Sequence, residues 1–82
     1  MRIRIRLFAT YRQLVGQETL NLDIEGLATV ADVIEQLESE YPQFSGRLKN
    51  NALVALNEVY ARRQEPVQPQ DTIAFFPPVS GG

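Results

Sequence analysis

The 82-residue sequence contains no cysteine and no histidine. Without cysteine, the chain has no disulfide framework, no thiol nucleophile and no thiolate ligand for a metal. Without histidine, it lacks the usual general base and the most common metal ligand. These absences predict a protein with no metal site and no bound cofactor, which is not an enzyme by itself.

Long apolar runs and a strong charge of one sign are also missing. No apolar stretch approaches the ~20 residues that cross a membrane, and the N-terminus alternates arginine with aliphatic residues, unlike a signal peptide. A net charge of −2 argues against broad affinity for nucleic acid. We therefore expect a cytoplasmic protein that binds neither a membrane nor nucleic acid.

The residue patterns predict a small α+β domain. Residues 2–8 and 19–24 alternate polar with aliphatic side chains, so both are expected to be half-buried strands of one antiparallel pair. Apolar residues then recur at helical spacing, which predicts one amphipathic helix over residues 30–40. Thr29 and Asp32 resemble a capping box at its start.

Further strands are expected after the helix, at residues 52–56, at a short edge segment 59–60 and at 72–76. The order strand, strand, helix, strand, short strand, strand is typical of one sheet with one face covered by the helix. Residues 1–76 are therefore predicted to form a single domain.

Strand parity places two phenylalanines on the sheet face opposite the helix. If Phe75 points into the core, its neighbour Phe76 must point outward, and the same rule places Leu7 inside and Phe8 outside. An exposed apolar patch of this kind is typical of a partner surface, and Tyr60 is a candidate to extend it. The alternative is that a twist or bulge at the strand end turns one phenylalanine back.

The charged residues fall into two groups. Arg2, Arg4 and Arg6 share the outward face of the first strand, and the acidic overall balance favours a solvated face over a nucleic-acid site. Residues 18–40 hold seven carboxylates and no Lys or Arg. Carboxylates can form an acid–base pair or a hard-metal site, but solvation, with some steering of a basic partner, fits this helix surface better.

Residues 77–82 are predicted to form an extended, mobile tail. Pro77 and Pro78 donate no ladder hydrogen bonds and favour extended geometry. Gly81 and Gly82 have no side chains, so the tip fits a narrow channel, and the Gly82 carboxylate is a candidate reactive group. No phosphate-binding GxxxxGK[ST] loop is present, so an enzyme acting in trans would have to activate it. The alternative is an ordinary frayed terminus.

The segment AFFPPVSGG (74–82) is close to the C-terminal signature of the MoaD family, the small sulfur-carrier subunits of molybdopterin synthase, in which threonine often stands at the position of Ser80. LFATYRQLVG (7–16) resembles the first-strand and loop pattern of that family, and TVADVIEQL (29–37) and ALNEVYA (55–61) match more loosely. The resemblance covers essentially the whole chain. It implies the ubiquitin-like β-grasp fold, with a mixed sheet of four to five strands and one main helix packed on one face.

The resemblance also implies a sulfur carrier in molybdenum cofactor biosynthesis. An E1-like enzyme would use ATP to adenylate Gly82, and sulfur from a persulfide donor would convert it to a thiocarboxylate. The large synthase subunit, expected in a heterotetramer, would then receive the tail, and the sulfur would pass to cyclic pyranopterin monophosphate. The residues implied to thread the tail are Gly81, Ser80 and Val79. Those implied to bind partners are Phe8, Tyr60, Phe76, Pro77 and Pro78, although leucine is familiar at the position of Tyr60.

Other functions remain open from the sequence. The chain could carry sulfur for thiamine synthesis or another pathway, although FFPP before the tail is not typical of those carriers. A second possibility is a ubiquitin-like modifier joined through Gly82 to lysine amines. A third is a plain interaction domain whose terminal glycines have no chemical role.

Overall fold

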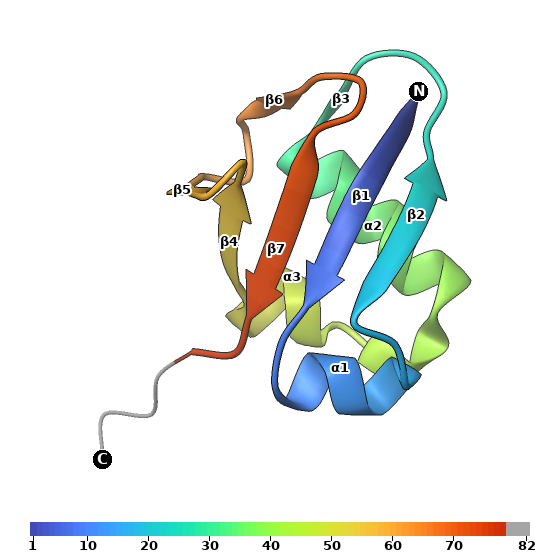
Figure 1. Cartoon of the computed structure of the whole chain (residues 1–82), viewed down its shortest axis with the longest axis vertical. Coiled ribbons are helices and arrows are strands. Elements are labelled where there is room, and N and C mark those ends of the chain that lie inside the picture. The colour runs from blue at the N-terminus through green and yellow to red at the C-terminus, as the bar shows by residue number, and fades with distance from the viewer. Residues whose placement is uncertain (79–82) are drawn as a thin grey trace.

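The computed structural model describes residues 1–78, which form two layers, a sheet and a set of helices on one of its faces (Figure 1). Within these residues the main sheet is five-stranded, in the order β2-β1-β7-β4-β5. Its strands are β1 (Arg2–Leu7), β2 (Thr19–Asp23), β4 (Leu53–Leu56), β5 (Val59–Tyr60) and β7 (Thr72–Phe76). A small second sheet pairs β3 (Ala28–Thr29) with β6 (Pro66–Val67).

The sheet is mixed because the neighbouring strands β1 and β7 run parallel, while the other pairs are antiparallel. β1 pairs with β7 in parallel and with β2 in antiparallel orientation, while β4 is antiparallel to both β7 and β5. Along β1, exposed arginines alternate with fully buried Ile3, Ile5 and Leu7, as the sequence pattern predicts. The mixed sheet with a helix across one face confirms the predicted β-grasp arrangement.

The main helix, α2 (Val30–Glu40), packs its apolar stripe against the sheet. Val30, Val33 and Leu37 are completely buried. The predicted capping box is present: the Asp32 N–H donates to Thr29 Oγ1 at 3.3 Å, and the Thr29 N–H donates to the Asp32 carboxylate at 2.9 Å. The helix therefore begins where its first free N–H groups find side-chain acceptors.

Removing the capping hydroxyl should measurably destabilise the domain. Thr29→Ala is expected to lower the free energy of unfolding by about 1 kcal/mol, because the Asp32 N–H then loses its side-chain acceptor. The measurement is urea denaturation followed by circular dichroism. Ser39→Ala, at an exposed position of the same helix, is the control and should be neutral or slightly stabilising. Equal midpoints for Thr29→Ala and the natural chain would contradict the prediction.

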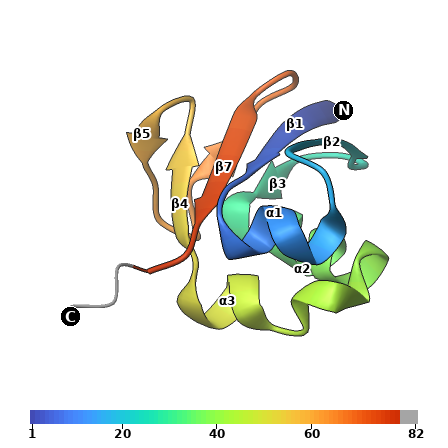
Figure 2. The ribbon, with the colours of Figure 1, turned by 60° about the horizontal axis from the view of Figure 1, so that its bottom comes forward.

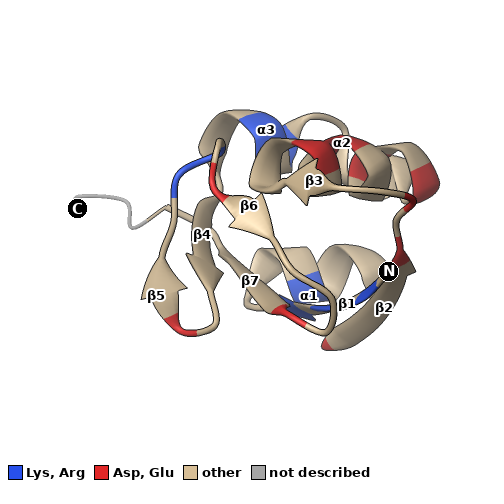
Figure 3. Ribbon diagram, turned by 90° about the horizontal axis from the view of Figure 1, so that it is seen from above, with Lys and Arg blue, Asp and Glu red and all other residues tan. Residues whose placement is uncertain are grey.

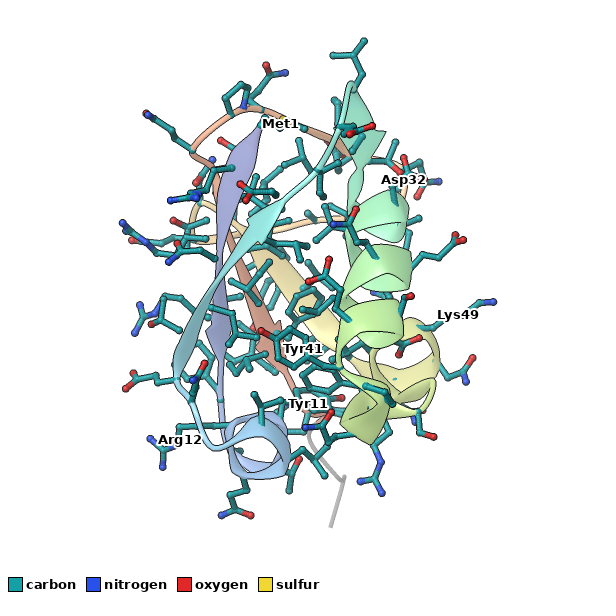
Figure 4. The ribbon with its side chains drawn as sticks, turned by 90° about the vertical axis from the view of Figure 1, so that its right-hand side faces the viewer. Met1, Tyr11, Arg12, Asp32, Tyr41 and Lys49 are labelled. Carbon is teal, nitrogen blue, oxygen red and sulfur yellow. The ribbon has the colours of Figure 1, made fainter. Side chains whose placement is uncertain are left out.

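The link between β1 and β2, for which no helix was predicted, contains the helix α1 (Thr10–Val15). Its buried residue Tyr11 meets Phe44 of the 3₁₀ helix η1 (Pro42–Phe44) edge to face, with ring centroids 6.3 Å apart. Burial raises the pKa of Tyr11, and the nearby charge of Arg47 partly offsets this. Figure 4 shows Tyr11 and Tyr41 between the sheet and α2, whereas Arg12 points outward.

A further short helix, α3 (Arg47–Asn51), is held at both ends by side chains distant in sequence. The Glu38 carboxylate accepts hydrogen bonds from the N–H groups of Leu48, at 2.9 Å, and Lys49, at 3.2 Å. The Arg63 guanidinium donates to the carbonyls of Leu48, at 3.0 Å, and Ala52, at 2.8 Å. The helix depends on tertiary contacts, and so its sequence carries no strong helical pattern.

The helices all lie on one side of the main sheet (Figure 2). The opposite face of the sheet is not covered by any element of residues 1–78. Within the same residues no helix combines the length and apolar character needed to span a membrane.

Candidate functional site

Phe8 and Phe76 meet on the uncovered face of the sheet. Their rings are stacked, with centroids 4.6 Å apart and planes inclined by 12°. Phe75 is completely buried, while Phe76 and Phe8 are only partly buried. The parity prediction for these positions is confirmed, and no bulge turns either ring back into the core. Their role as partner contacts stays a prediction.

The backbone at Ala9 separates Phe8 from the helix that follows. Ala9 has φ 52° and ψ −125°, a backbone conformation that residues other than glycine rarely adopt. Such a turn costs of order 1–3 kcal/mol and is kept only where the surrounding structure demands it. Here it redirects the chain from β1 into α1 immediately after Phe8, so that α1 packs on the core side while the Phe8 ring stays on the outer face.

A hollow of about 300 Å³ opens beside the two stacked rings. The hollow exists because small residues form its floor: Ala74 on β7 pairs in register with Ala55 on β4. The larger neighbours stand around them as walls. The hollow is lined by Arg6, Phe8, Ala55, Glu58, Tyr60, Thr72, Ala74 and Phe76, and is called the aromatic hollow below.

Tyr60 forms the far wall of the aromatic hollow, from the edge strand β5, and is 76% exposed. The two-residue turn before it, Asn57-Glu58, has φ values of 50° and 72°, as two-residue hairpins require. Asn57 also ties this hairpin to β7, because its Nδ2 donates to Asp71 Oδ1 at 3.0 Å and its Oδ1 accepts from the Thr72 N–H at 3.0 Å. The structure thus places Tyr60, a candidate to extend the patch, around the same hollow as Phe8 and Phe76. Its role as a partner contact stays a prediction.

Arg6 supplies positive charge at the rim of the aromatic hollow. Its guanidinium carbon lies 5.2 Å from the centroid of the Phe8 ring, within range of a cation–π contact. Its Nη2 also lies 3.4 Å from a carboxylate oxygen of Glu18 on the β2 side. Arg6 was expected on a solvated strand face, and its place at the hollow could not be predicted because it depends on the pairing of β1 with β7.

Most carboxylates of residues 18–40 that make hydrogen bonds stabilise the fold, either as ion pairs with arginines or as helix caps. Glu18 and Asp23 pair with arginines of β1, Asp32 caps α2 and Glu38 caps α3. Among the side chains of residues 1–78, no group of three potential ligands is placed to hold a metal ion.

The chain leaves β7 beside the aromatic hollow. Pro77, next to Phe76, is partly buried, and Pro78 is exposed. The predicted tail residues Val79, Ser80, Gly81 and Gly82 lie outside the described residues, so their roles stay predictions. Phe76, which lines the aromatic hollow, is the last residue of β7, and the chain continues directly from it into Pro77. Figure 1 shows the chain leaving the sheet at this end of β7.

Comparison with known proteins identifies the family. The sequence pattern of the ThiS family matches residues 5–82. This chain belongs to the ThiS family. The resemblance to MoaD proteins is confirmed as well: the molybdopterin synthase sulfur carrier subunit of Haemophilus influenzae is 35% identical over 81 residues, covering 98% of this chain and 99% of that protein.

Other relatives are named as protein modifiers and not as sulfur carriers. The small archaeal modifier protein 3 of Haloferax volcanii is 35% identical over 92 residues, covering 100% of both chains. The crystal structure of SAMP1 from the same organism has a TM-score of 0.88 to this ThiS-family chain at 30% identity, with 100% of each chain covered. The relatives therefore agree on the fold, while their names divide between sulfur carrier and modifier.

Proposed function

We propose that this protein is a sulfur carrier for molybdopterin synthesis, with the sulfur attached to the main chain at Gly82. The observation that carries the proposal is that Phe76, the last residue of β7 before the tail, forms one wall of the aromatic hollow. A partner seated on the hollow is therefore well placed to receive the tail. The similarity to sulfur carrier subunits over nearly the whole chain supports the same function.

The proposed chemistry divides the work between this chain and its partners. The Gly82 carboxylate attacks the α-phosphorus of ATP on an E1-like enzyme, pyrophosphate leaves, and an acyl adenylate forms. A persulfide sulfur then attacks the acyl carbon and displaces AMP, and a thiol reduces the resulting S–S bond to leave the thiocarboxylate. ATP thus acts in trans, and this chain needs no bound cofactor of its own.

The proposed acceptor is the large subunit of molybdopterin synthase, in a heterotetramer within the cytoplasm. In that complex Phe8, Tyr60 and Phe76 would contact the partner with Pro77 and Pro78, while Val79, Ser80 and Gly81 would thread toward its active site. The synthase passes the sulfur to cyclic pyranopterin monophosphate. This chain supplies the sulfur and is not an enzyme by itself.

Intact mass spectrometry tests the chemistry directly. The protein is incubated with the activating enzyme, ATP and a persulfide donor, and we expect one oxygen at the C-terminus to be replaced by sulfur. The thiolated protein is then mixed with the large subunit and the pterin precursor, and molybdopterin formation is measured. An unchanged mass, in a mixture that thiolates another sulfur carrier, would overturn the proposal.

Filling the aromatic hollow should block partner binding without unfolding the protein. Ala74→Leu adds a larger side chain to the outer floor of the hollow, and we expect the Kd for the large subunit to rise about tenfold or more. Ala31→Leu, at an exposed position of α2, is the matched control and should leave the Kd unchanged. Isothermal titration calorimetry measures both. Unaltered affinity in Ala74→Leu would show that the partner does not enter the hollow.

A ubiquitin-like modifier is the second candidate, favoured by the 35% identity to small archaeal modifier protein 3. In that case the activated Gly82 carbonyl would be attacked by a lysine amine, forming an isopeptide bond. Tagged protein expressed in cells would then appear as conjugates that resist denaturation, and these would disappear when Gly82 is deleted. A thiocarboxylate without conjugates favours the carrier.

A further inference from the structure

Three arginines form a continuous strip along the outer face of β1. Arg2, Arg4 and Arg6 are exposed, and alternate with buried aliphatic residues. Successive guanidinium-bearing positions are about 6.6 Å apart along the strand. Arg6 also lines the aromatic hollow and lies over the Phe8 ring. The arginine strip and the aromatic hollow are therefore one surface.

The strip has weak internal partners. Arg2 Nε lies 3.2 Å from Asp23 Oδ1, and the two side chains are 68% and 74% exposed. The Arg6–Glu18 pair is 3.4 Å long and about half exposed. Exposed pairs of this kind contribute little to stability. Within residues 1–78 the Arg4 side chain makes no ion pair or hydrogen bond. The guanidinium groups can thus exchange their acceptors for those of another molecule at small cost.

A second hollow, of about 470 Å³, surrounds the middle of the strip. Besides Arg2 and Arg4 it is lined by Ile3 and by the amide residues Asn21 and Gln70. Asn21 is placed there because it pairs in register with Arg4. Gln70 is held there because its N–H donates to the Arg2 carbonyl at 2.8 Å. Guanidinium and amide groups both carry N–H donors, and a carboxylate accepts hydrogen bonds from such groups.

Both signs of charge occur on each side of the molecule. The charged residues of α2 are all acidic, but α3 in the same layer carries Arg47 and Lys49, as the blue on α3 in Figure 3 shows. The sheet side carries Glu18, Asp23 and Glu58 as well as the arginines of β1. The arginine strip is thus a local run of positive charge, and an acidic segment of a partner is attracted to it.

We propose that the arginine strip binds carboxylates of the same protein partner whose apolar side chain fills the aromatic hollow. The partner then presents an acidic segment beside an apolar anchor, and contact with the strip fixes the orientation of the partner on the sheet. This inference rests on the proposed function only in assuming that a partner protein uses the hollow. The net charge of −2 disfavours a polyphosphate such as nucleic acid.

Charge reversal at Arg4 tests the strip with the large synthase subunit. Arg4→Glu is expected to lower the association rate constant about tenfold at about 50 mM NaCl, and the difference should shrink to about twofold at about 500 mM NaCl, because salt screens the attraction. Arg47→Glu, at the start of α3 in the helical layer, makes the same charge change and should leave the rate within about twofold. Stopped-flow fluorescence measures the rates, and melting curves verify that both variants fold.

If the large subunit binds Arg4→Glu as fast as the natural chain, the proposed role of the arginine strip is wrong, while the proposed function remains intact. A second probe tests the strip without any synthase: a fluorescein-labelled peptide with glutamate at alternate positions followed by leucine. We expect anisotropy to show binding that weakens about fivefold or more in Arg4→Glu but not in Arg47→Glu.

If the natural chain does not bind the large subunit but binds the peptide in a way that depends on Arg4, the proposed function is wrong. The same result would support carboxylate binding by the arginine strip. A duplex DNA or a phosphatidylserine vesicle that binds more tightly than the peptide would overturn the protein-partner assignment. So would a peptide affinity that is the same in both variants.

Discussion

Deletion of Gly82 is expected to abolish sulfur transfer while leaving the melting temperature of the protein nearly unchanged. In the proposed function the reacting carboxylate belongs to this residue alone. Within residues 1–78 the buried core consists of side chains between Ile3 and Phe75, and Gly82 has no side chain that could add to it. Deletion of Gly82 should therefore remove the activity without changing the stability of the fold.

Extension of the chain by one alanine after Gly82 should be as harmful as the deletion. One extended residue moves the carboxylate by about 3.3 Å, and displacement of a reacting group by even ~1 Å can cost about 100-fold in rate. We expect sulfur transfer in both variants to fall by more than about 100-fold, measured as molybdopterin formed with the large subunit.

Ser80→Thr is the control for these tail variants, because threonine often stands at that position in the MoaD family. It should keep most of the activity. A large drop in melting temperature on deletion of Gly82 would instead assign the residue a structural role and contradict the proposal.

The adjacent phenylalanines of β7 should respond to alanine substitution in opposite ways. Phe76 stacks on Phe8 on the outer face, so Phe76→Ala is expected to weaken partner binding by about 2 kcal/mol or more, roughly 30-fold in Kd. Its cost to stability should be about 1 kcal/mol, the size of a lost aromatic pair. Phe75 is completely buried, so Phe75→Ala should cost about 3–5 kcal/mol of stability.

Urea denaturation and calorimetry with the large subunit measure the two effects on each variant. Phe75→Leu, which keeps most of the buried volume, should fold and bind the partner with nearly natural affinity. A Phe76→Ala variant that unfolds at much lower urea but binds normally would place the ring in the core and refute the assignment. The same result would remove the main support for the partner surface.

Periodicity accounts for the parts of the fold that could be predicted. β1, β2, α2 and β7 each repeat a pattern over several residues, so their limits, their buried faces and the Thr29–Asp32 cap follow from local sequence. The helices α1, η1 and α3 were missed, since each is too short to repeat a pattern. They form because Tyr11, Phe44 and the capping carboxylate of Glu38 find partners far along the chain.

The amino-acid order by itself determined which side of each strand faces water, because neighbouring side chains of a strand must point in opposite directions. It thereby placed Phe8 and Phe76 on the outer face. It could not show that these rings stack, that Ala55 and Ala74 form a floor between them and Tyr60, or that Arg6 stands at the rim. Those facts depend on the parallel pairing of β1 with β7 and on the register of β4, and strand register is a property of the packed sheet.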